Sequence, residues 1–181
     1  MARIALCLAV ALLPCSVVAR HQGPVKLEDV LRVLKYYTDP RPADFAQAGS
    51  QVDSVLAELV VEPRADEEVR CRAARALGRF GGTRAVRVLV ATMSAPDYPE
   101  RVRAAAMVGL ALASGEAALE DLKPYLKGPS AVLRIGAAEA LGVMGGERAR
   151  VLLTASLESE EVLEVRAAME AALKAMSGGT R

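Results

Sequence analysis

The stretch VRCRAARALG at residues 69–78 decides the fold of this chain, because its pattern returns three more times. The copies start at Val69, Val102, Leu133 and Val165, which are 33, 31 and 32 residues apart. In every copy an arginine directly follows the starting residue. Counted from that starting residue, a leucine lies eight positions later and a glycine thirteen positions later. A repeat of this period is typical of stacked helical arrays, in which each unit buries its apolar face against its neighbours.

Each copy predicts two helices. In the first helix, apolar residues and alanines recur at the start and at offsets four, seven and eight, which is the spacing of one helical face. Alanine pairs such as Ala73 and Ala74 let neighbouring helix axes approach closely, and a glycine such as Gly82 is expected to end the helix. The second helices have apolar residues in steps of four, namely Ala85, Leu89 and Met93, then Ala118, Leu122 and Leu126, then Ala149, Leu153 and Leu157.

These patterns predict one all-α domain over residues 26–178, a right-handed α-solenoid of the HEAT-like or armadillo type. Tyr36 and Tyr37 are expected to pack at the N-terminal end of this array. The predicted units are an irregular cap unit 26–62, repeats 66–95, 99–127 and 130–158, and a terminal half-repeat 160–177.

The motif VRxxAAxALG at residues 69–78, repeated as LRxxAAxALG at residues 133–142, resembles the short HEAT-like repeats of phycobilin lyases and many other proteins. The resemblance covers about residues 26–178 and implies their superhelical architecture. The shared residues are core and turn positions, so the resemblance identifies no ligand. It does imply one alternative function, in which the protein acts as a lyase-like or chaperone-like assistant in the modification of a partner protein.

Residues 1–19 have the features of a secretory signal peptide. A basic start at Arg3 precedes an unbroken apolar run at residues 4–13, and small residues occupy the positions before a cleavage site after Ala19. Cleavage would leave residues 20–25 as a short tail and export the protein to the periplasm or beyond, with no membrane span in the mature chain. A retained anchor and a lipoprotein attached through Cys15 are the weaker alternatives.

Composition limits the classes of partner. Apolar residues make up 52% of the chain and aromatic residues only 3%, and the formal net charge is +1. This balance does not favour nucleic acid as a partner. Cys71 is the single cysteine that remains after cleavage, so no intramolecular disulfide is possible and stability must come from apolar burial. Cys71 is expected to be a packed helix residue, with a reactive or intermolecular thiol as the alternative.

Catalytic chemistry has little support in the sequence. The one histidine, His21, lies in the predicted tail, and one histidine with one cysteine cannot supply a zinc site. No glycine-rich phosphate loop follows a predicted strand. The sequence therefore predicts no catalytic residue, cofactor or metal ligand.

The repeated arginine lies near the start of each first helix, where the helix dipole disfavours a cation. We therefore expect each one to contact a carboxylate or a carbonyl of the adjacent repeat, forming a structural ladder, with a row of ligand-binding arginines as the alternative. The four residues are Arg70, Arg103, Arg134 and Arg166.

A curved array typically binds a protein segment on its inner surface, and we expect the second helices to line that surface. The main hypothesis is a non-catalytic adaptor or scaffold that binds a protein partner; a self-associating structural module is a further alternative. Charge is uneven, with seven arginines at residues 64–87 and five glutamates at residues 158–170, which suits an acidic partner or contact between copies. The candidate partner-binding residues are Arg84, Arg87, Glu120, Lys123, Arg148 and Thr154.

Overall fold

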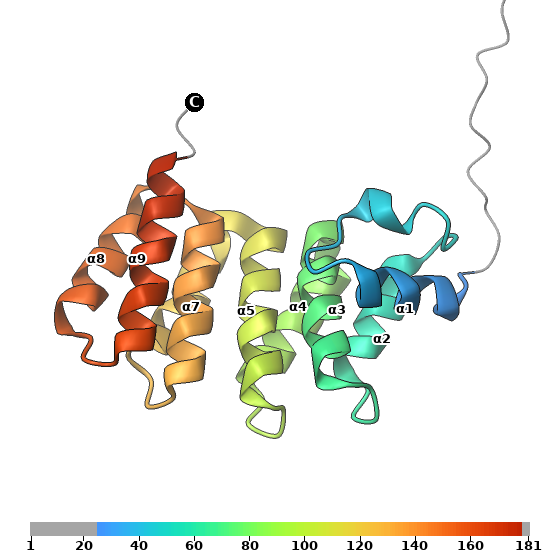
Figure 1. Cartoon of the computed structure of the whole chain (residues 1–181), viewed down its shortest axis with the longest axis horizontal. Helices are drawn as coiled ribbons and strands as arrows, with labels where there is room; N and C mark the ends of the chain where they lie inside the picture. The colour runs from blue at the N-terminus through green and yellow to red at the C-terminus, as the bar shows by residue number, and fades with distance from the viewer. Residues whose placement is uncertain (1–24, 179–181) are drawn as a thin grey trace, which may run out of the picture.

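The structure is a computed structural model that describes residues 25–178, and helices dominate this range (Figure 1). The described residues contain no strand. The predicted signal peptide, its cleavage site, Cys15 and His21 lie outside the described residues. The elements are α1 (Leu27–Tyr36), η1 (Pro42–Phe45), α2 (Val52–Val61), α3 (Glu67–Phe80), α4 (Gly82–Ser94), α5 (Glu100–Ser114), η2 (Gly115–Ala118), α6 (Leu119–Leu122), η3 (Lys123–Lys127), α7 (Ala131–Met144), α8 (Glu147–Ser159) and α9 (Leu163–Gly178), where η marks a 3₁₀ helix.

The helices form two layers, as Figure 1 shows. The helices that carry the repeated motif, α3, α5, α7 and α9, lie side by side in one layer. Behind them lie α2 and α4, and α8 stands next to α9 at the left end of the view. Each helix of the first layer packs mainly on its neighbours in the same layer. The prediction of an all-α solenoid is therefore confirmed.

Backbones almost touch within the first layer. A Cβ atom added to Gly78 on α3 would overlap the backbone of Gly109 on α5, and one added to Gly142 on α7 would lie 2.8 Å from the Cβ atom of Ala172 on α9. The second helices contact one another much less. Because the more closely spaced layer of a curved array lies on its inner side, α3, α5, α7 and α9 form the concave face.

This arrangement corrects the expectation that the second helices line the inner surface. The alanine pairs of the first helices did predict a close approach of neighbouring helix axes, but the expectation did not conclude from them that the first helices form the inner layer. Because the alanines and glycines of the first helices have small side chains or none, the axes of α3, α5, α7 and α9 lie close together. The second helices instead project larger side chains, such as Leu89 and Leu153, into the core. The second helices therefore form the outer, convex layer.

The second half of the middle repeat is not one continuous helix, in contrast to the prediction. It consists of η2, the single turn α6 and η3. Pro124 lies at the start of η3 and has no backbone N–H to donate, which disfavours a regular α-helix there. The predicted apolar stripe is nevertheless buried, since Ala118, Leu122 and Leu126 are at most 3% exposed.

Glycine pairs make the sharp turns between α3 and α4 and between α7 and α8. Gly145 and Gly146 have φ angles of 71° and 84°, a left-handed conformation that side chains disfavour. The first glycine closes α7 by donating from its amide to the carbonyl oxygen of Leu141 at 3.0 Å. The turn thus begins one residue earlier than the repeated glycine at position 146 predicted.

The two ends of the array are closed in different ways. At the N-terminal end, Phe45 of η1 packs edge-on against Phe80 with 5.7 Å between ring centroids. Tyr36 and Tyr37 are 73% and 49% exposed, so the expectation that these tyrosines pack at this end is wrong. At the other end, Lys174 occupies on α9 the position that Gly142 occupies on α7. A lysine there obstructs the close approach of a further helix.

One helical stretch of the described residues, Glu100–Lys127, is long and apolar enough by composition to cross a membrane. Over half of its apolar window, 56%, is buried inside the array. A central core helix such as α5 passes the same test, so this stretch is weak evidence for a membrane span.

Candidate functional site

A groove of about 460 Å³ runs across α3, α5 and α7 on the concave face. Its floor is made of small or aliphatic residues of α5 and α7, and its rim is made of charged residues of α3, α5 and α7. The lining residues are Thr38, Glu68, Cys71, Arg72, Arg75, Arg101, Ala104, Ala105, Val132, Ile135, Gly136 and Glu139.

Two helices that are not neighbours are joined across this groove. Arg75 of α3 donates from Nη2 to Oε2 of Glu139 on α7 at 2.7 Å, over the top of α5. Val108 holds the equivalent repeat position on α5 and is only 1% exposed. The side chains of α3 and α7 meet because this face is concave and because α5 presents short side chains to it.

The other arginines of the groove also have partners within the fold. Arg72 donates to Oε1 of Glu68 at 2.8 Å and to the carbonyl oxygens of Leu34 and Lys35, which end α1. Arg101 lies 3.1 Å from Glu68. The hydrogen bond from Arg72 lowers the pKa of Glu68, with a further contribution from the charge of Arg101, so both arginines face a carboxylate that stays ionised.

Cys71 lines the same groove but is only 8% exposed. Burial raises the pKa of its thiol to about 11. At neutral pH the group is therefore a thiol and a poor nucleophile, which confirms the expectation of a packed helix residue.

Each of the four repeated arginines donates to carbonyl oxygens at the end of the preceding second helix. Arg70 reaches Val60 at 3.1 Å, Arg103 reaches Met93 at 3.0 Å, and Arg166 reaches Leu157 and Glu160. The guanidinium groups thereby satisfy acceptors that a helix end leaves free, and they oppose the negative end of its dipole. This explains why an arginine near a helix start is tolerated four times.

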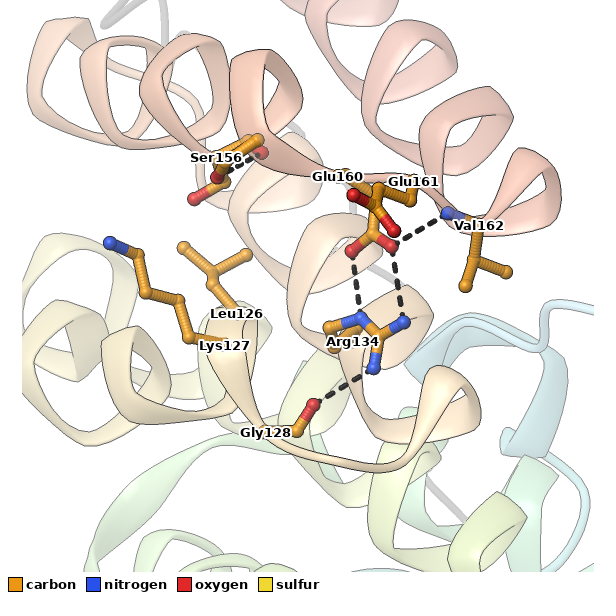
Figure 2. A pocket seen from close by; sticks show the side chains of 9 residues that line it. Leu126, Lys127, Gly128, Arg134, Ser156, Glu160, Glu161 and Val162 are labelled. Carbon is orange, nitrogen blue, oxygen red and sulfur yellow. Dashed lines mark hydrogen bonds and ion pairs between the residues drawn. The ribbon is translucent and has the colours of Figure 1, made fainter.

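Arg134 differs from the other three because it also binds forward along the array. It donates to the carbonyl oxygens of Gly128 and Pro129, and it forms two hydrogen bonds, 2.7 and 3.1 Å long, with the carboxylate of Glu160 (Figure 2). Glu160 in turn accepts from the amide of Val162 at the start of α9. The hydrogen bond from Arg134 is the main cause of the lowered pKa of Glu160.

The six candidate partner-binding residues lie on the outer layer. None of them lines the groove between α3, α5 and α7. Several are held by neighbours: Arg84 donates to Ser54, and Arg148 pairs with Glu116 and Glu120 at 3.2 and 3.0 Å. All six are exposed, namely Arg84, Arg87, Glu120, Lys123, Arg148 and Thr154.

Sequence reasoning missed the groove because it followed the wrong layer. The signal was present at the sixth residue after each motif start, where Arg75, Val108 and Glu139 form one row across the array. Once these helices are known to form the inner layer, opposite charges two repeats apart with a short residue between them predict an ion pair across the middle helix. The described residues include no group of three or more His, Cys, Asp or Glu side chains arranged to hold a metal ion.

Comparison with known families agrees with this architecture. The profile for HEAT repeats matches residues 29–111, 52–134 and 97–174, which together cover most of the array. The chain therefore belongs to the HEAT-repeat family, whose members commonly serve as scaffolds for protein interaction. The comparison with curated proteins finds no match.

Proposed function

We propose that this protein is a non-catalytic scaffold that holds a segment of a partner protein in the groove across α3, α5 and α7. The observation that carries the proposal is the bridge from Arg75 to Glu139 over α5, which marks a concave face with charged walls and a short-chain floor. A groove of about 460 Å³ is large enough for a few side chains of a bound segment.

The chemistry of the groove suits a partner that presents both an apolar side chain and charged groups. Val132 and Ile135 offer apolar contact on α7, and Val132 is 36% exposed. The ion pair between Arg75 and Glu139 is 37% and 43% exposed on its two sides, so opening it costs about 0–1 kcal/mol. A partner carboxylate or cation replaces one member of the pair at little cost.

Site-specific photo-cross-linking tests this proposal. A photoreactive residue placed at Arg101, on the groove rim, is compared with the same residue at Arg87 on the outer layer, in an extract of the exported fraction. We expect a discrete adduct from position 101 only, and we expect Val132→Trp to abolish it by filling the groove. Val151→Trp on the outer layer is the matched control, since Val151 is 56% exposed. An adduct from position 87 alone, or one indifferent to Val132→Trp, rejects the groove.

We further propose that the protein is exported after cleavage following Ala19, and that its repeats are of the short type found in phycobilin lyases. The first rests on the basic start and apolar run of residues 1–19, and the second on the VRxxAAxALG motif. Mass spectrometry of the protein from its native cell tests export: an N-terminus at Arg20 supports it, and an intact Met1 in the cytoplasm contradicts it.

A further inference from the structure

A second cleft lies on the outer layer, between η3 and α8. It encloses about 380 Å³, and its walls include the apolar residues Pro124, Leu126, Leu152 and Ala155. One wall of the cleft comes from the second half of the middle repeat, where η3 takes the place of a continuous α-helix, and the other comes from α8. It is separate from the groove of the concave face, with which it shares no lining residue.

Two lysines line this cleft and have no ion pair among residues 25–178. Lys123 and Lys127 are both exposed, in contrast to Arg72, Arg75 and Arg134, which are all paired within the fold. In Figure 2 the side chain of Lys127 points away from the pair of Arg134 and Glu160. The cleft thus combines apolar walls with two cations that have no carboxylate partner in the described chain, and its one acidic lining residue, Glu120, is paired with Arg148 at 3.0 Å.

The chain carries a segment of matching character at residues 158–164. Leu163 is 76% exposed, more than any other large apolar side chain among the described residues. Glu158, Glu161 and Glu164 surround it in the sequence, are exposed, and have no ion pair in the described range. An exposed leucine flanked by carboxylates is the complement of an apolar cleft flanked by lysines.

The cleft and the acidic segment are also close neighbours. A further hollow of about 390 Å³ shares Leu126, Lys127 and Ser156 with the cleft and extends to Glu161 and Val162. The cleft and the acidic segment thus lie in one surface patch. Two copies of such a patch can pair about a two-fold axis, with the acidic segment of each copy in the cleft of the other.

We propose that two copies of this protein associate through this patch, with the acidic segment 158–164 of each copy seated at the cleft of the other. In the dimer, Leu163 contacts the apolar wall and the glutamates meet Lys123 and Lys127. Extension of the stack from the end of α9 is disfavoured by Lys174. The cleft lysines lie beside apolar walls and carry no ion pair among residues 25–178, so the acidic segment meets them without first displacing a carboxylate of the same chain.

Sedimentation equilibrium of residues 20–181, which contain the whole described array, tests the proposal. We expect a concentration-dependent rise from the mass of one chain to that of two. The variant Lys123→Glu/Lys127→Glu should raise the dimer dissociation constant about tenfold or more, because it turns attraction into repulsion. The control Lys26→Glu/Arg87→Glu makes the same change in net charge at exposed positions outside the cleft and should leave the constant unchanged.

A rescue variant separates loss of binding from loss of fold. Adding Glu161→Lys/Glu164→Lys to Lys123→Glu/Lys127→Glu exchanges the signs across the interface and should restore the dimer to within about threefold. Leu163→Ser should weaken the dimer without any change of charge. A single-chain mass at all concentrations, or a dimer indifferent to the lysine reversal, overturns the proposal.

Discussion

Arg75 and Glu139 are 64 residues apart in the sequence, and their side chains meet at 2.7 Å across the helix that lies between them. Contact between alternate helices of a stack is favoured by a concave face and by short side chains on the helix between them. Together with the close backbone approach at Gly78 and Gly142, the pair identifies the helices of the repeated motif as the inner layer, which carries the groove.

The first prediction concerns the energy of this bridge. Both side chains are more than a third exposed, so their coupling free energy should be below about 1 kcal/mol. A double-mutant cycle of Arg75→Ala and Glu139→Ala, followed by urea unfolding, measures it. A coupling of several kcal/mol would mean that the pair holds the array together and is not free to open for a partner.

The second prediction concerns Gly78, which lies inside α3. Replacement of an exposed helical glycine by alanine usually stabilises a helix by about 0.5–1 kcal/mol. Gly78→Ala should instead lower the free energy of unfolding by about 1–3 kcal/mol, because the new methyl group overlaps the backbone of Gly109. Urea unfolding measures the change.

Gly128→Ala is the matched control for Gly78→Ala. Its φ angle is −69°, and a Cβ atom there meets nothing closer than the carbonyl oxygen of Tyr125 at 3.6 Å. This substitution should change stability by less than about 0.5 kcal/mol. A neutral Gly78→Ala would show that the helices of the inner layer are farther apart than described.

The third prediction concerns Thr92 on α4, which is 1% exposed and whose hydroxyl has no hydrogen-bond partner among the described residues. A buried unpaired hydroxyl is costly, so Thr92→Val should leave stability unchanged or raise it by up to about 1 kcal/mol. Thermal unfolding checks the sign. Thr154→Val, at an exposed hydroxyl that donates to the carbonyl oxygen of Arg150 at 3.0 Å, is the comparison and should not stabilise.

The fourth prediction concerns acid sensitivity at Glu160. Because Arg134 lowers its pKa from the usual value of 4.5, the folded state binds protons less readily than the unfolded chain does. The stabilisation is complete above about pH 4.5 and is lost as the pH falls below that value toward the lowered pKa. Urea unfolding across this range should show a smaller loss of stability for Glu160→Gln than for the wild type.

Glu161→Gln controls for the removal of a carboxylate from the same loop. Glu161 is exposed and has no ion pair in the described range, so this variant should keep the acid sensitivity of the wild type. Equal acid sensitivity in Glu160→Gln and the wild type would contradict the role assigned to Arg134.

The repeat pattern was enough to predict the class of fold and the buried stripes. Leu77, Leu110 and Leu141 are all buried where the helical spacing placed them. The same pattern could not show which layer is inner, because that depends on the relative spacing of two layers and not on either helix alone. The residues that indicate the inner layer are Gly78, Gly109 and Gly142, because they allow neighbouring helices to approach closely. This role can be recognised only when the neighbouring helices are placed next to one another.

The site was less accessible from the sequence than the fold. The ladder arginines were found because they repeat, and their acceptors are backbone carbonyls that every helix end provides. Arg75 lies in the arginine-rich stretch 64–87 that the sequence analysis assigned to an acidic partner or to contact between copies. Its pairing with Glu139 was not predicted, because charge at this position does not repeat from one copy to the next. The interruption of the helix near Pro124, beside the outer cleft, was also not predicted, because the apolar residues of this segment keep the regular spacing of a continuous helix.

The motif helices, and not the second helices, form the concave face, and this arrangement can be tested directly by cross-linking. Cysteine pairs at Arg75 and Glu139, and at the equivalent outer positions Arg87 and Val151, can be introduced into a Cys71→Ser background and treated with a short bis-maleimide. We expect rapid intramolecular cross-linking of the 75–139 pair and little of the 87–151 pair, and we expect this difference to disappear in urea. Faster cross-linking of the 87–151 pair would contradict this arrangement.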